Sequence, residues 1–232
     1  MGDKVKMKKL KRFLFVILIL AGSFAIYIQI VNRNSINMTY RQKVLKAIYP
    51  VWMWWAKLKG VNTKQLSNEK AAPVVSFYSL KDTLNDGTTI DFAQLKGKKI
   101  LLVNTASNCG YTDQYEDLQK LYETNQDKLV IIGFPANDFK EQEKGNDEEI
   151  SAFCKLNFAI SFPLMKKSSV KKGIHQNKIF DWLTDAAKNG WNSQQPSWNF
   201  CKYMVDEQGR LSNYFGSTIE PLGKEISEAL NR

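Results

Sequence analysis

Residues 99–112 read KILLVNTASNCGYT, an apolar run followed directly by a polar loop that contains Cys109. The unbroken apolar run predicts a strand that is covered on both faces of a sheet. Apolar residues at helical spacing then predict a helix around 115–122. Cys109 is therefore expected at the start of a helix, at the carboxyl edge of a parallel sheet, where free backbone N–H groups lower the pKa of a thiol. A buried, unreactive cysteine would explain the same residue.

The elements on either side of this segment alternate between strands and helices. A second buried strand is predicted at 129–134, and Asp147 opens a helix whose first turn is acidic, as the helix dipole favours. The turn Asn85-Asp86-Gly87 predicts a hairpin between 74–78 and 88–90. The remaining elements are a helix around 179–183, a second hairpin of 202–205 with 211–215, and a last helix over 220–231. This order predicts one three-layer α/β domain over 73–232 with an N-terminal hairpin.

The N-terminus has the pattern of a membrane anchor. A basic tail, 1–12, precedes an apolar run, 13–31, whose nineteen residues would span roughly 28 Å as a helix. A cleaved signal peptide is the alternative, although its apolar stretch is usually shorter, about 7–15 residues. Six basic residues before the run, against four soon after it, favour a cytoplasmic N-terminus. The sequence thus predicts a single-pass signal-anchor with the domain on the trans side of the membrane.

Residues 32–72 are expected to form a juxtamembrane segment and a linker. Within 40–59, apolar residues follow helical spacing at Val44, Ile48, Val51, Trp55 and Leu58. Such a helix could lie in the lipid headgroup region, or it could pack on the domain through its tryptophans. Pro50 is expected to kink or divide it. Residues 60–72 are polar and are predicted to be a linker.

Charge and composition exclude several classes of function. The 232 residues carry a net charge of +10, but residues 1–60 alone carry +11, so the rest is close to neutral and no nucleic-acid partner is expected. The single histidine, His175, removes most zinc and histidine-triad chemistry. The three cysteines include no C-x-x-C pair. Neither a metal nor a cofactor is expected.

Three separated motifs resemble those of the glutathione peroxidase family in its cysteine form. They are the loop 104–112 with Cys109, the loop 133–139 followed by Gln142-Glu143, and Trp198-Asn199-Phe200. The resemblance covers residues 73–232, and it implies a thioredoxin-like fold and the reduction of hydrogen peroxide or organic hydroperoxides. The residue types suit this chemistry, because a thiolate must attack a peroxide oxygen beside hydrogen-bond donors. The Trp198 indole and the Asn199 amide are such donors.

Asp138 departs from the family, which usually has Gln at this position. An ionised carboxylate only accepts hydrogen bonds, and its charge would raise the pKa of a neighbouring thiol. Asp138 could therefore point away to cap backbone N–H groups, stay protonated, or act as a base. The first arrangement is the one predicted here, because Asp readily binds backbone in loops.

The family resemblance also implies the later steps of a catalytic cycle. The sulfenic acid on Cys109 needs a resolving thiol, for which Cys154 is favoured and Cys201 is the alternative. Because a disulfide needs Cα atoms within about 7 Å, a helix that carries Cys154 would have to unwind locally. The expected reductant is a thioredoxin-like protein, or less favourably glutathione. The short stretch between Val170 and Trp198 lacks the insertion of tetrameric animal members, which points to a monomer.

Two other functions are compatible with the sequence. A membrane-anchored thiol–disulfide oxidoreductase would share the fold class, but it would need a second cysteine where Thr112 stands. A peroxide sensor would use the same first step on Cys109 without turnover.

Overall fold

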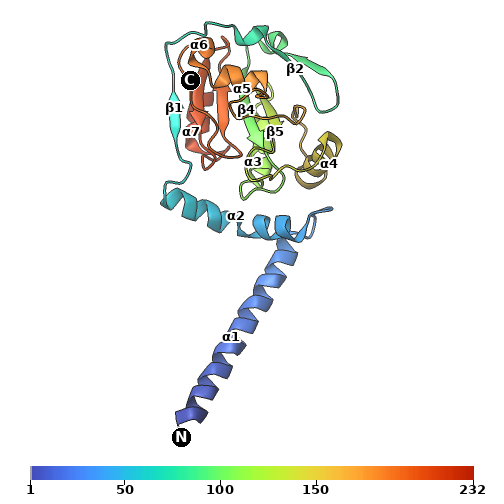
Figure 1. Cartoon of the computed structure of the whole chain (residues 1–232), viewed down its shortest axis with the longest axis vertical. Helices are drawn as coiled ribbons and strands as arrows, with labels where there is room; N and C mark the ends of the chain where they lie inside the picture. Colours follow the sequence, from blue (N-terminus) through green and yellow to red (C-terminus); the bar gives the residue numbers. More distant parts are fainter. Residues whose placement is uncertain (1) are drawn as a thin grey trace.

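The N-terminal part consists of two helices that stand apart from the sheet. The computed structural model describes residues 2–232, with side chains from residue 5 onward. Helix α1, Gly2–Val31, contains a stretch, Val5–Val31, long and apolar enough to cross a membrane, as a membrane anchor or a signal sequence would be. Helix α2, Tyr40–Leu58, lies crosswise between α1 and the domain (Figure 1). The Asn32 side chain at the end of α1 donates to the Lys43 carbonyl at 3.0 Å, and this contact joins the two helices.

The domain is built on a five-stranded sheet in the order β1-β7-β6-β4-β5. The two predicted buried strands are confirmed as β4, Lys99–Thr105, and β5, Leu129–Pro135, which run parallel. The predicted second hairpin is confirmed as β6, Lys202–Val205, and β7, Leu211–Phe215. Strand β1, Gln65–Ser67, pairs with the outer edge of β7. Because β1 lies in the predicted linker, the folded sheet includes residues before Pro73.

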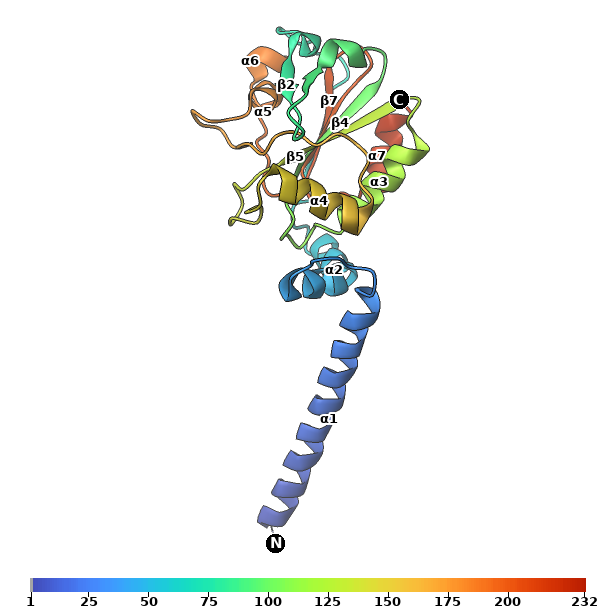
Figure 2. The same ribbon diagram turned by 90° about the vertical axis from the view of Figure 1, so that its right-hand side faces the viewer.

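Helices cover both faces of this sheet. Leu101 and Val103 of β4 point into a core with α3, Gln114–Thr124, α4, Asp147–Phe158, and α7, Lys224–Leu230. The alternate residues of β4 point into a second core with α5, Lys178–Leu183. Figure 2 shows α3 and α7 on one side of the sheet and α5 with α6, Ala186–Asn189, on the other. The three-layer, thioredoxin-like architecture is therefore confirmed.

The first hairpin is shorter than predicted. Strand β2, Lys81–Thr83, pairs with β3, Thr89–Asp91, across the predicted turn. The expected strand 74–78 is wrong, because the N–H groups of Val74 and Val75 both donate to the Lys188 carbonyl and a 3₁₀ turn, Phe77–Ser79, follows. The last helix begins at Lys224 and not at 220, since a turn from Glu220 to Gly223 precedes it.

Helix α2 has one face on the domain and one face in solvent. It continues as a single helix through Pro50, so of the two predicted effects, a kink or a division, the division does not occur. The buried side chains of α2 are Ala47, Met53 and Ala56; Met53 belongs to the core of the domain, whereas the Ala47 carbonyl accepts a hydrogen bond from Tyr27 of α1. Most of the predicted apolar stripe is exposed, at Ile48, Val51, Trp55 and Leu58. The helix therefore packs on the domain and still leaves much of its apolar surface exposed.

Candidate active site

Cys109 lies in the turns that join β4 to α3. The helix begins only at Gln114, so the prediction that Cys109 starts the helix is wrong by several residues. The Thr112 hydroxyl holds this loop, because it accepts from the Cys109 N–H at 3.0 Å and donates to the Ala106 carbonyl at 2.7 Å. The backbone N–H of Tyr111 points at the Cys109 Sγ, 3.5 Å away. A turn of backbone thus supplies the donor that a helix terminus was expected to supply.

Burial opposes the activation of this thiol. Cys109 is only 1% exposed, and burial raises its pKa above the usual value for a thiol. Hydrogen bonds from the Tyr111 N–H, from the Trp198 and Asn199 side chains and from the Gly110 N–H lower the pKa but do not outweigh burial. The predicted net lowering of the pKa is therefore wrong in this state.

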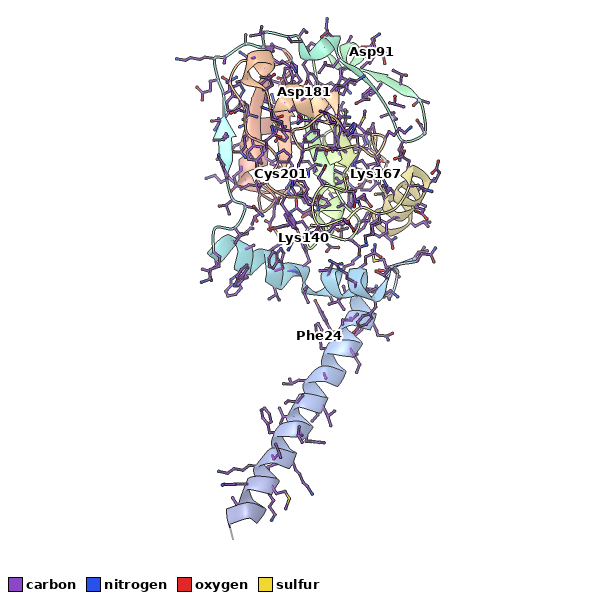
Figure 3. The ribbon with its side chains drawn as sticks, viewed as in Figure 1. Phe24, Asp91, Lys140, Lys167, Asp181 and Cys201 are labelled. Carbon is purple, nitrogen blue, oxygen red and sulfur yellow. The ribbon has the colours of Figure 1, made fainter. Side chains whose placement is uncertain are left out.

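The cover over Cys109 comes from the N-terminal segment. The thiol borders a cavity of about 10 Å³ whose outer wall is made by Met38, Gln42, Leu45 and Lys46. The Gln42 side-chain amide donates to the Ser107 carbonyl at 3.1 Å, which fixes α2 on the catalytic loop. The Lys140 ammonium, 5.7 Å from the Trp198 ring centroid, lies at the end of the domain that faces α2 (Figure 3). The cysteine is thus closed off by a helix and not by the domain alone.

The loop before β6 brings Trp198 and Asn199 to Cys109. Its position is set by Asn104 at the end of β4, whose side chain donates to the Trp198 carbonyl at 2.9 Å and accepts from the Cys201 N–H at 3.0 Å. The Asn199 amide donates to the Gln142 Oε1 at 2.9 Å. Its own Oδ1 is buried without a partner among the described residues. The structure therefore brings together the three residues that the motifs singled out.

Gln142, and not residue 138, is the side-chain amide at this site. Asp138 accepts from the Ser169 hydroxyl and from the Val170 N–H, each at 2.7 Å, so the predicted orientation away from the thiol is confirmed. Gln142 is buried beside Asn199, and its carbonyl accepts from the Asn108 N–H at 3.0 Å. Asp138 is therefore bound to Ser169 and Val170, and the side-chain amide beside Asn199 belongs to Gln142. The available signal was that Gln142 follows the 133–139 motif in the sequence.

Glu143 holds the catalytic loop in place through hydrogen bonds from Ser107. Its carboxylate accepts from both the N–H and the hydroxyl of Ser107, at 2.9 and 3.0 Å. Burial, which leaves only 2% of Glu143 exposed, raises its pKa to about 7, and the two Ser107 hydrogen bonds oppose this shift. The carboxyl group is thus partly protonated near neutral pH.

We expect Glu143 to make stability depend on pH. Because the pKa is higher in the folded state than the usual 4.5, the protonated form favours folding, and this contribution is lost as the pH rises through about 7. Between about pH 4 and about pH 8, wild type should lose about 3 kcal/mol of unfolding free energy relative to Glu143→Gln. Denaturant unfolding of both proteins at each pH measures the difference. Parallel pH profiles would contradict the assignment.

The other two cysteines lie on opposite faces of the sheet. Cys154 is buried in α4 within the same core as Cys109, whereas Cys201 is buried in the core on the other face. The Cys201 Sγ lies 3.4 Å from the Tyr214 hydroxyl and 3.5 Å from the Ser217 hydroxyl. Burial raises the pKa of Cys154 to about 12. All three cysteines are free thiols.

Comparisons with known proteins agree with this geometry. The family model described as glutathione peroxidase matches residues 77–184. The chain is 41% identical over 160 residues to glutathione peroxidase-like peroxiredoxin 2 of Saccharomyces cerevisiae, covering 68% of this chain and 98% of that protein. It is 41% identical over 158 residues to the glutathione peroxidase homolog BsaA of Staphylococcus aureus (strain MW2), covering 67% of this chain and 99% of that protein. The crystal structure of Trgpx in apo form superposes with a TM-score of 0.52 at 30% identity, covering 68% of this chain and 97% of that chain.

Proposed function

This chain belongs to the glutathione peroxidase family, and from that premise we propose that it is a thiol peroxidase that reduces hydroperoxides at Cys109. The observation that carries the proposal is the convergence of Trp198, Asn199 and backbone N–H groups on a single thiol at the end of β4. Donors around a sulfur, with no basic side chain bonded to it, suit a reaction in which negative charge moves from sulfur to oxygen.

The first step is a displacement at oxygen. The Cys109 thiolate attacks one oxygen of the hydroperoxide, so that an S–O bond forms while the O–O bond breaks. The cysteine is oxidised to a sulfenic acid, and the leaving alkoxide or hydroxide takes a proton from water. The Trp198 indole and the Asn199 amide stabilise the thiolate before attack and the charge on the departing oxygen during it.

Cys154 is the proposed resolving residue. Its thiolate attacks the Cys109 sulfur, an S–S bond forms while the S–O bond breaks, and the sulfenic oxygen leaves as hydroxide, which takes up the proton released by the Cys154 thiol and becomes water. A dithiol reductant of the thioredoxin type then reduces the disulfide and is itself oxidised. Cys154 shares a core with Cys109, whereas the sheet separates Cys109 from Cys201, and this supports Cys154 over Cys201. Because Cys154 is fully buried, α4 has to unwind locally before its thiol reacts.

The membrane part of the proposal depends on α1. We infer that Val5–Val31 remains as a single-pass anchor, because nearly all of its side chains are exposed in the monomer and the basic residues precede it. The excess of positive charge before the span supports a cytoplasmic N-terminus and a catalytic domain on the trans side. The proposed active species is a monomer.

Gln142 is expected to support the first step by orienting Asn199. Gln142→Leu removes the hydrogen bond to the Asn199 amide, a loss of about 1.4 kcal/mol that should slow the oxidation of Cys109 about tenfold. Asp138→Asn is the matched control, since Asp138 binds Ser169 and Val170 and not the thiol. Stopped-flow oxidation of the two variants by hydrogen peroxide measures this. A slower reaction in Asp138→Asn, with no change in Gln142→Leu, would reverse the assignment.

A multiple-turnover assay tests the proposed function. The full chain in lipid nanodiscs is given hydrogen peroxide with NADPH, thioredoxin reductase and thioredoxin, and in a second arm with glutathione and its reductase. Sustained NADPH oxidation in the thioredoxin arm is expected. One turnover followed by arrest would indicate a peroxide sensor. Reduction of insulin disulfides without peroxide consumption would indicate a thiol–disulfide oxidoreductase.

A further inference from the structure

A second cavity lies between α2 and the catalytic loops. Its volume is about 440 Å³. The N-terminal segment lines it with the apolar side chains Leu45, Ile48, Trp52 and Val61, and the domain contributes Gly110, Tyr111, Gln142 and Trp198. Its N-terminal wall lies outside residues 77–184, which match the family model. The cavity is therefore a feature that this chain adds to the family's site.

This cavity is adjacent to the peroxidatic thiol. Leu45 and Gly110 line both it and the small cavity that borders Cys109, so these two residues are the partition between the two spaces. Trp198, whose side chain donates to the thiol, is also in the wall. A change in the position of Leu45 would therefore join the larger cavity to the reacting sulfur.

The cavity wall contains a polar group without a partner. The Trp52 Nε1 is buried, and no hydrogen-bond acceptor lies near it among the described residues. It lies 3.6 Å from where a side chain on Gly110 would begin, so the indole is in van der Waals range of the catalytic loop. A buried donor without an acceptor is costly unless a ligand supplies one. An oxygen of a bound hydroperoxide would be such an acceptor.

The cavity opens toward an exposed apolar surface. Ile48 lines the cavity and is also 36% exposed, next to Val51 and Trp55 on the outer face of α2. Helix α1 extends from one end of α2 on the side away from the domain (Figure 1). An apolar chain could therefore pass from a lipid phase along α2 into the cavity without crossing a polar surface.

We propose that this cavity binds the aliphatic chain of an organic hydroperoxide and so favours lipid-derived hydroperoxides over hydrogen peroxide. The inference rests on the proposed function and assigns part of its substrate site to α2. Leu45, Ile48 and Trp52 contact the chain, and the free Trp52 N–H donates to the oxygenated end. Trp52 is a specificity residue in this arrangement, because it lines the larger cavity and not the one at the thiol, and hydrogen peroxide is too small to reach from the thiol to Trp52.

The test compares two substrates on the full chain in nanodiscs. Wild type should have a higher kcat/KM for linoleic acid hydroperoxide than for hydrogen peroxide. Trp52→Ala should lower kcat/KM for linoleic acid hydroperoxide about tenfold, because a large apolar contact is lost. It should not lower kcat/KM for hydrogen peroxide. Trp54→Ala is the matched control, since Trp54 is 66% exposed on α2 and is not among the residues that line the cavity. This variant should leave kcat/KM unchanged for both substrates. A phospholipid hydroperoxide in the nanodisc, as a third substrate, distinguishes a membrane-borne source from a free one.

A binding measurement keeps the test independent of turnover. The unreactive alcohol, hydroxy-linoleic acid, should inhibit wild type competitively and bind about tenfold more weakly to Trp52→Ala and to Ile48→Glu. Two results would overturn this inference and leave the proposed function intact. In one, Trp52→Ala lowers kcat/KM equally for both substrates. In the other, the alcohol does not inhibit wild type, although hydrogen peroxide is still turned over. Wild type that turns over no hydroperoxide would overturn the proposed function as well.

Discussion

Replacing Cys109 by serine is expected to reduce hydroperoxide consumption to the uncatalysed rate. A serine hydroxyl is almost entirely protonated at neutral pH, and the donors around position 109 do not include a side-chain base that could take its proton. No stable oxidised product comparable to a sulfenic acid would form either. Peroxide consumption and the intact mass of the protein after one equivalent of peroxide measure the two losses.

Cys201→Ser is the control for this substitution. Cys201 is as buried as Cys109, but it lies in the core on the other face of the sheet, where hydroxyl groups surround its sulfur. This variant should keep both the first oxidation and sustained turnover. If Cys109→Ser still turned over peroxide, and this turnover disappeared when Cys201 was also replaced, Cys201 would be the peroxidatic residue.

Replacing Cys154 by serine should separate the first step from the rest of the cycle. One equivalent of peroxide should still oxidise Cys109, because the donors around that thiol are unchanged. Thioredoxin-supported turnover should fall to background, since no disulfide forms for the reductant to attack. The sulfenic acid should then accumulate and be captured by dimedone, while excess peroxide drives it to the sulfinic acid. Full turnover in Cys154→Ser, together with loss of turnover in Cys201→Ser, would exchange the two roles.

The parts of the fold that could be predicted are those encoded by local pattern. Strand β4 is an unbroken apolar run, α3 has helical spacing, and the turn at Asn85-Asp86-Gly87 has a strong hairpin signal. Strand β1 has no such signal. It is the three-residue sequence Gln65–Ser67, and it becomes a strand only because the edge of β7, far along the chain, offers free backbone groups.

The candidate site could be predicted in its residues but not in its electrostatics. Cys109, Trp198 and Asn199 were recognisable from motifs, whereas Gln142 was identified only when its bond to Asn199 was known. The pKa of Cys109 could not be predicted, because burial dominates it, and residues of α2, far away in the sequence, form part of the cover. The sequence left open whether α2 lies in the headgroup region or packs on the domain through its tryptophans; Trp52 packs on the core beside Tyr111, whereas Trp54 is exposed.

Pro50 has a consequence for how the thiol becomes accessible. Proline has no N–H, so the carbonyl four residues earlier, that of Lys46, lacks its usual helical partner. This missing bond lies between Leu45, which separates the two cavities, and Trp52, which closes the outer one. The backbone there is held by fewer bonds than the rest of α2, and the amide protons that flank Pro50 should exchange with solvent sooner than those near Ala56. Helix α2 is therefore expected to bend most easily at Pro50, close to the residues that cover the Cys109 thiol.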